Sequence, residues 1–159
     1  MQIKVFLSSS YAEEMLINRD LFRAELLARF NIISGQIGAS TYFVDYEYGI
    51  PHNTSEDTVI RICASSVRES DLFFCILGRN YGHQIKIRHL PEDLCNLAVD
   101  FGYRSVNEKI SILELEILTA LSAHPERSIF FIQTSSKFST YLFISRQMAI
   151  SLAFIVIRN

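Results

Sequence analysis

Two short apolar runs, each closed by a polar residue or a glycine, constrain the fold of this chain most. They are Asp71–Gly78 and Ser128–Gln133, and they are typical of strands buried on both faces, as in a parallel sheet covered by helices. The run Ile3–Leu7 stops at the serines Ser8–Ser10, which are expected to form a turn of small residues before a helix. Thr41–Asp45 is rich in residues that favour strands. The sequence therefore predicts four strands spread along the chain.

Helical patterns separate these strands. They cover Tyr11–Phe30, a stretch that begins at Asn53 or Thr54 and ends near Glu69, and Ile110–Ala123. Alternation of strands and helices in this order is typical of an α/β fold with an open parallel sheet. We expect one flavodoxin-like, doubly wound domain over residues 1–159, with about five parallel strands and helices on both faces.

Two segments have weaker patterns. We expect residues 82–109 to form an insertion over the carboxyl edge of the sheet, either with a short helix near Glu92–Val99 or poorly ordered. Phe138–Ile157 is apolar, but Arg146 lies in its middle, which disfavours a membrane span. A helix over 138–149 followed by an edge strand is expected there, from the pattern alone.

Charge and cysteine content indicate which partners to exclude and which cell compartment to expect. The formal net charge is −2 and no basic block is present, so we expect no binding to nucleic acid or to anionic membranes. The three cysteines Cys63, Cys75 and Cys95 have no CxxC spacing, and no secretory signal begins the chain. A reducing cytoplasm is the expected location.

The strand order predicts a binding crevice. In a flavodoxin-like sheet the first and third strands are neighbours, which brings Ser8, Ser9 and Ser10 beside the segment 78–82. Backbone N–H groups at a helix N-terminus bind phosphate, and Arg79 and Tyr81 suit the rest of a nucleotide. An ordinary capped turn and a glycine turn without a ligand are the alternatives.

The helix over Ile110–Leu121 carries two acidic side chains among apolar neighbours. Its pattern predicts a single buried stripe, formed by Ile110, Leu113, Ile117 and Leu121. On a helical wheel Glu114 and Glu116 lie roughly 200° apart, so both cannot face one pocket. A carboxyl group in apolar surroundings is suited to acid/base or ion-stabilising chemistry. Pairing with a base such as Lys109, or plain exposure, is the alternative for each.

Other chemistry is disfavoured by the absence of its motifs. The sequence has no GxSxG motif, P-loop or GxGxxG motif, which disfavours serine hydrolysis, phosphoryl transfer and dinucleotide oxidoreduction. No metal site is predicted, because the histidines have no paired ligand spacing: His52, His83, His89 and His124.

Four motifs, in order, resemble the TIR-like N-terminal domains that precede NACHT/STAND NTPase modules with WD or tetratricopeptide repeats. They are Val5–Ser9 with Arg19, Val44–Ile50, Asp71–Gly82 and Ser111–Glu116, and the resemblance spans roughly residues 3 to 133. The sequence departs from the family pattern at Glu47, where an arginine is usual, and at Leu113, where a threonine is usual. The chain is expected to be an excised domain, a truncated copy or a free-standing relative.

The resemblance implies a role in defence signalling and two alternative molecular functions. Some TIR members cleave the nicotinamide–ribose bond of NAD, which would be a substrate here and not a resident cofactor, and others associate only with like domains. If the chain is a nucleosidase, Glu116 matches the catalytic position best, with Glu114 the second candidate. The implied substrate contacts are phosphate on Ser8, Ser9, Ser10 and Arg79, a ring on Tyr48 or Tyr81, and a ribose hydroxyl on Asp45.

Two rival functions stay open beside NAD cleavage. One is a catalytically silent module for homotypic assembly. The other is a glycosidase that resembles nucleoside deoxyribosyltransferases, which also use a glutamate but accept nucleosides and not a dinucleotide.

Overall fold

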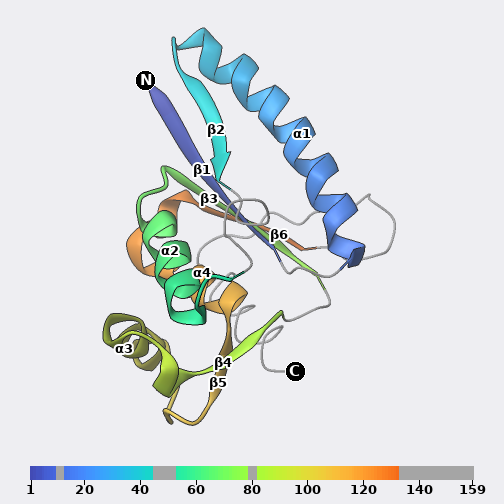
Figure 1. Ribbon diagram of the computed structural model, residues 1–159. Helices are drawn as coiled ribbons and strands as arrows, with labels where there is room; N and C mark the ends of the chain where they lie inside the picture. The colour runs from blue at the N-terminus through green and yellow to red at the C-terminus, as the bar shows by residue number, and fades with distance from the viewer. Residues whose placement is uncertain (10–12, 45–52, 79–81, 133–159) are drawn as a thin grey trace.

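The centre of the molecule is a four-stranded parallel sheet. The computed structural model describes residues 1–9, 13–44, 53–78 and 82–132. The strands are β1 (Gln2–Ser9), β2 (Ser40–Val44), β3 (Leu72–Leu77) and β6 (Ser128–Ile132), in the order β2-β1-β3-β6 (Figure 1). The predicted α/β class, with a parallel sheet and the first and third strands as neighbours, is confirmed.

The direction in which strands are added to the sheet reverses at β1. β2 lies on one side of β1, whereas β3 and then β6 lie on the other side. Residues 2–6 of β1 pair with β2, and residues 5–9 pair with residues 72–76 of β3. All neighbouring strands are parallel, so their carboxyl ends meet at one edge of the sheet. In open α/β sheets the crevice at such a reversal is the usual ligand site.

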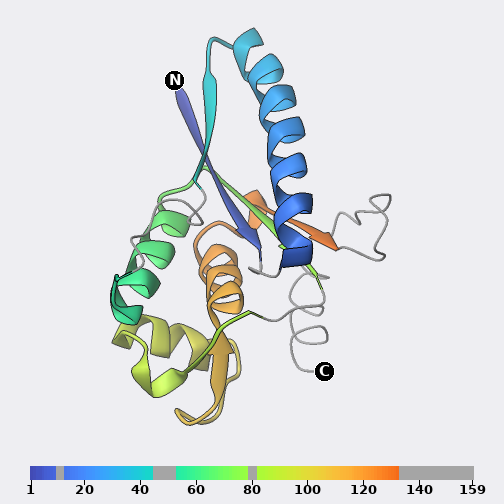
Figure 2. The same ribbon diagram turned by 45° about the vertical axis from the view of Figure 1, so that its right-hand side comes forward.

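Helices cover both faces of the sheet. Figures 1 and 2 show α1 (Glu13–Gln36) on one face, with α2 (Glu56–Arg68) and α4 (Ile112–Ala123) on the other. Because side chains alternate along a strand, β1 contributes to a core on each face. Val5 and Leu7 pack on the α1 side, whereas Phe6 packs on the α4 side.

The boundaries of α1 and α2 differ from the predictions by a few residues. α1 continues six residues past Phe30 and stops where Gly38 adopts a φ of +69°, a left-handed conformation that glycine adopts readily. The cap of α2 is Ser55, whose side chain accepts a hydrogen bond from the Thr58 N–H, and not Asn53 or Thr54.

The segment between β3 and α4 is an ordered layer and not a loop over the carboxyl edge of the sheet. It contains β4 (Gln84–Lys86), the 3₁₀ turn η1 (Ile87–His89), α3 (Glu92–Asp100) and β5 (Lys109–Ser111), with β4 and β5 antiparallel. Its apolar side chains pack on the outer sides of α2 and α4, in one cluster with residues such as Ile60 and Leu118. The short helix predicted near Glu92–Val99 is confirmed; its position in the fold was predicted wrongly.

This layer changes the environment of α4. The helix begins at Ile112, two residues later than predicted, because Ile110 belongs to β5 and Ser111 caps the helix. Every residue from 113 to 121 is buried, whereas the sequence predicted a single buried stripe. Leu113 and Ile117 pack on the sheet side and Leu115 and Leu118 on the insertion side, so both long faces of α4 are covered.

The C-terminal predictions lie outside the described residues. They are the helix over 138–149 and the edge strand that would be the fifth of the sheet. A 3₁₀ turn, η2 (Pro125–Arg127), leads into β6, the last described strand. Within the described ranges, no helix has the length and apolarity needed to cross a membrane.

Candidate functional site

The carboxyl group of Glu116 lies at the carboxyl end of β1. The Ser8 hydroxyl donates a hydrogen bond of 2.5 Å to Glu116 Oε2, and the exposed fractions of the two residues are 2% and 9%. Ser8 follows Phe6 on the sheet face that α4 covers, and Glu116 lies in the first half of α4. The topology therefore brings together two polar side chains that are 108 residues apart in the chain.

Two buried thiols border this pair. Cys75 lies opposite Ser8 in the β1–β3 register, and Cys63 comes from α2. Burial raises the pKa of both thiols, and the negative charge of Glu116 raises each pKa further. Glu116 thus lies in a buried cluster with one hydroxyl and two thiols that stay protonated at neutral pH.

Ser8 and Ser9 are the last two residues of β1. The ladder with β3 continues through the pair Ser9 and Ile76, so these two serines do not form the turn that the sequence predicted there. Ser9 alternates with Ser8 and therefore faces the α1 side, away from Glu116. Ser8 is the serine that contacts the carboxylate.

Glu114 faces the inserted layer. Its Oε1 accepts a hydrogen bond from the Tyr103 hydroxyl, and the exposed fractions of the two residues are 5% and 7%. Tyr103 follows α3 and belongs to the apolar cluster of the insertion. The two glutamates therefore point to different parts of the molecule, as the helical wheel predicted.

Comparison with known families gives a clear assignment. Residues 4–148 match a family whose description is "Domain of unknown function (DUF4062)". The chain belongs to the DUF4062 family. No curated protein and no solved structure matches the chain.

The match to DUF4062 covers every residue predicted for the site. Of these, the structure places Ser8, Ser9, Glu114 and Glu116 and brings together only Ser8 and Glu116. The remaining predictions lie outside the described residues: Ser10, Asp45, Tyr48, Arg79 and Tyr81. Asp45 directly follows β2 in the chain, and Arg79 comes two residues after β3.

Three residues that surround the two carboxyl groups of this DUF4062 domain are not indicated by its sequence. Cys63 and Cys75 have no motif spacing, and Tyr103 lies in a segment whose sequence pattern is weak. No local sequence pattern identifies them, because only the tertiary fold brings each of them close to α4.

Proposed function

We propose that this chain is a TIR-like, nucleotide-binding domain that cleaves the nicotinamide–ribose bond of NAD, with Glu116 as its catalytic carboxylate. The observation that supports the proposal is the Ser8–Glu116 hydrogen bond at the carboxyl end of β1, beside β3. A carboxylate there lies at the edge of the sheet where α/β proteins commonly bind nucleotides.

The proposed reaction is hydrolysis of an N-glycosidic bond. The bond between the ribose anomeric carbon and the nicotinamide nitrogen breaks, and its electron pair leaves with nicotinamide. Water then attacks the anomeric carbon and loses a proton, so the products are nicotinamide, ADP-ribose and a proton. The Glu116 carboxylate stabilises the positive charge that builds on the sugar, as carboxylates do in glycosidic cleavage.

The surroundings of Glu116 suit this role. An ion held among buried side chains acts through a lower effective dielectric than an ion in water, which strengthens its attraction to a developing cation. The Ser8 hydroxyl donates a hydrogen bond to one carboxylate oxygen and so fixes the orientation of the Glu116 carboxylate. Ser8 is therefore proposed to position Glu116, instead of binding phosphate as the sequence suggested.

The test measures nicotinamide release from NAD by the purified chain and by two variants. Glu116→Gln keeps the shape of the side chain and an acceptor for Ser8 but removes the charge. We expect it to lower turnover by about 100-fold or more. Glu114→Gln is the matched control, since Glu114 is also buried on α4 and bound to a hydroxyl, and we expect it to retain most of the turnover.

Three results would contradict the proposal. The first is a wild-type chain that releases no nicotinamide, and the second is equal turnover by wild type and Glu116→Gln. The third is release of free base from deoxynucleosides but not from NAD, which would favour the deoxyribosyltransferase-like alternative. Circular dichroism of each variant verifies that it is folded.

Homotypic assembly is a second candidate, supported by a separate observation. Large apolar side chains are exposed near the C-terminal end of α1 and the amino ends of β1 and β2. Their exposed fractions are 81% for Met1, 67% for Ile32, 61% for Ile33, 68% for Ile37 and 43% for Tyr42. An exposed apolar group of this kind is a common feature of protein interfaces.

A further inference from the structure

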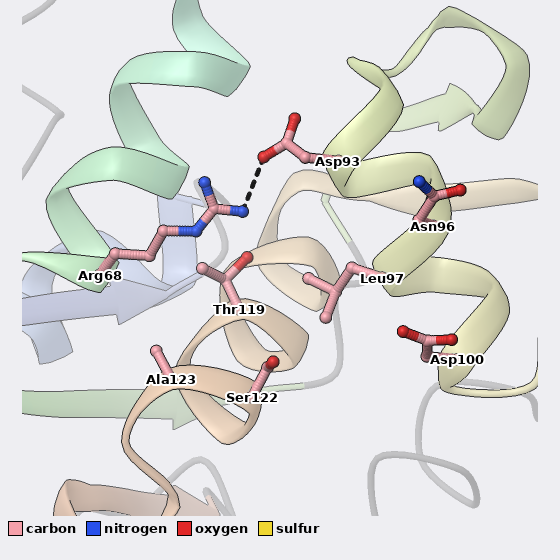
Figure 3. A pocket seen from close by; sticks show the side chains of 8 residues that line it. All are labelled: Arg68, Asp93, Asn96, Leu97, Asp100, Thr119, Ser122 and Ala123. Atoms are coloured by element: carbon pink, nitrogen blue, oxygen red, sulfur yellow. Dashed lines mark hydrogen bonds and ion pairs between the residues drawn. The ribbon is translucent and has the colours of Figure 1, made fainter.

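A second candidate site lies between the helices on the α4 side of the sheet. A cavity of about 280 Å³ has walls from α2, α3 and α4, and we refer to it as the α2–α3–α4 cavity. Figure 3 shows the side chains that line it. Its lining contains neither Glu116 nor Ser8. It is lined by Arg68, Asp93, Asn96, Leu97, Asp100, Thr119, Ser122 and Ala123.

The cavity lies toward the amino edge of the sheet, away from the proposed NAD site. Arg68 and Ala123 are the last residues of α2 and α4, and the strands β3 and β6 begin shortly after them. The C-terminal end of a helix carries a partial negative charge, because its last carbonyl groups have no partner within the helix. The Arg68 carbonyl accepts a hydrogen bond of 3.0 Å from His124 Nε2, and the remaining partial charge of the two helix ends favours a cation in this cavity.

The charged side chains add to this preference. Two aspartates against one arginine give the lining a net charge of −1. Arg68 is bound to Asp93 at 2.8 Å, and Figure 3 shows this ion pair across one side of the cavity. Asp100 lies on the α3 wall farther along and forms no ion pair with any residue in the described ranges. Its carboxylate is available to a ligand.

Neutral acceptors surround the same space. The side chains of Asn96 and Ser122 form no hydrogen bond within the described part of the chain. Thr119 is buried and donates its hydroxyl proton to the Leu115 carbonyl at 2.7 Å, so its oxygen can act only as an acceptor for a ligand. Leu97 supplies an apolar wall beside these groups.

From this arrangement we propose that the α2–α3–α4 cavity binds a guanidinium group. Guanidinium is planar, always charged and carries five N–H donors, which matches one carboxylate and several neutral acceptors. A methylene stem would lie along Leu97 and Ala123. A metal ion fits less well, because the described residues contain no group of three or more histidine, cysteine or acidic side chains that could hold one.

The test is an NMR titration of the ¹⁵N-labelled chain with two blocked amino acids of nearly equal shape. N-acetyl-arginine amide carries the guanidinium, and N-acetyl-citrulline amide replaces it with a neutral urea. We expect saturable shifts in α3 and in the C-terminal turns of α2 and α4 with the arginine compound only. A parallel titration with agmatine separates a free small molecule from a protein side chain, according to which of the two binds more tightly.

Two variants complete the test. We expect Asp100→Asn to weaken binding of N-acetyl-arginine amide by about tenfold or more, because it removes the charged acceptor. Asp20→Asn makes the same change at an exposed position on α1, across the sheet, and we expect its effect to stay within about twofold. Equal shifts with both blocked compounds, no saturable shift with arginine, or equal weakening by the two variants would each overturn the proposal.

Discussion

The buried thiols Cys63 and Cys75 make stability depend on pH. Burial raises the pKa of each thiol above its ordinary value of 9.0, and the charge of Glu116 adds to the effect. Below pH 9 the thiols are protonated in both the folded and unfolded states, so the full stability is present. As the pH rises further, the unfolded chain releases these protons while the folded chain keeps them. The free energy of unfolding then falls by up to about 1.4 kcal/mol per pH unit for each thiol.

Urea unfolding of wild type and Cys75→Ala between pH 7 and 10 measures this effect. We expect the variant to be less stable at pH 7, because truncation in a packed core leaves a cavity. The difference between the two proteins should shrink above pH 9, since the variant has lost one of the protonated thiols. Leu113→Ala, a core truncation without a thiol, is the control, and its difference from wild type should not depend on pH. Parallel curves for wild type and Cys75→Ala would contradict the prediction.

At the residue scale, the sequence predicted the direction in which side chains point better than it predicted the residues that they contact. The wheel of α4 separated Glu114 from Glu116, and the structure places them in different surroundings. Ser8 was predicted for the site but in a turn, because the apolar pattern of the strand ends before it. The strand continues through Ser9 because β3 supplies main-chain partners, which local sequence does not reveal.

The C-terminal end of α1 offers a matched pair of glycine substitutions. Gly38 has a φ of +69°, whereas Gly35 lies within the helix, and a Cβ at either position would meet nothing within 4 Å. We expect Gly38→Ala to lower the free energy of unfolding by about 1 kcal/mol, because left-handed backbone disfavours a Cβ. Gly35→Ala should raise it by about 0.5 kcal/mol, since alanine favours the helix. Urea unfolding that gives both changes the same sign would contradict this account.

The inserted layer is joined to α4 through Tyr103 and Glu114. Replacing Tyr103 with phenylalanine removes a donor from a buried carboxyl group, and we expect a loss of about 1–3 kcal/mol in the free energy of unfolding. The single variants Tyr103→Phe and Glu114→Gln, measured with the double variant by urea unfolding, should show a coupling energy of at least about 0.5 kcal/mol. Tyr42→Phe, at a tyrosine that is 43% exposed, is the control and should change stability by less than about 0.5 kcal/mol. If the effects of the two single variants add up in the double variant, the contact between Tyr103 and Glu114 does not stabilise the packing of the layer on α4.

At the element scale, strands were easier to predict than the insertion. An apolar run bounded by polar residues identifies a buried strand from local sequence alone. The order of β4, α3 and β5 depends instead on contacts with α2 and α4, which are far apart in sequence. The single-stripe interpretation of α4 failed for the same reason, because the layer that covers its second face was not recognised.

The topology of the whole molecule followed from the order of its elements. Alternating strands and helices restrict a parallel sheet to few arrangements, since crossovers are right-handed and neighbouring elements pack together. The order β2-β1-β3-β6 and the meeting of Ser8 with α4 both follow from this restriction. The surface that the molecule presents to partners does not follow from it, because a pattern of residues does not show which apolar side chains stay exposed.

Self-association is the prediction that belongs to this scale. Ile33 and Ile37 are 61% and 68% exposed near the end of α1, beside the amino ends of β1 and β2. Burial of such side chains between two copies would stabilise a complex by roughly 25 cal/mol for each Å² of apolar surface removed from water. We expect light scattering coupled to size-exclusion chromatography to show a mass that rises with concentration for wild type, and a monomer for Ile33→Glu/Ile37→Glu.

The control uses exposed apolar side chains elsewhere. Val99 and Val106 are 54% and 50% exposed on the inserted layer, so Val99→Glu/Val106→Glu adds the same two charges at a different surface. If the exposed end of α1 forms the interface, this variant should keep the concentration dependence of wild type, because its charges lie far from the contact. Loss of association in both variants would point to net charge as the cause, and a wild type that stays monomeric at all concentrations would remove homotypic assembly as a function of the chain alone. Measuring NAD turnover across the same range of concentration then shows whether association and catalysis are linked, since a linked activity would rise with the fraction of assembled chains.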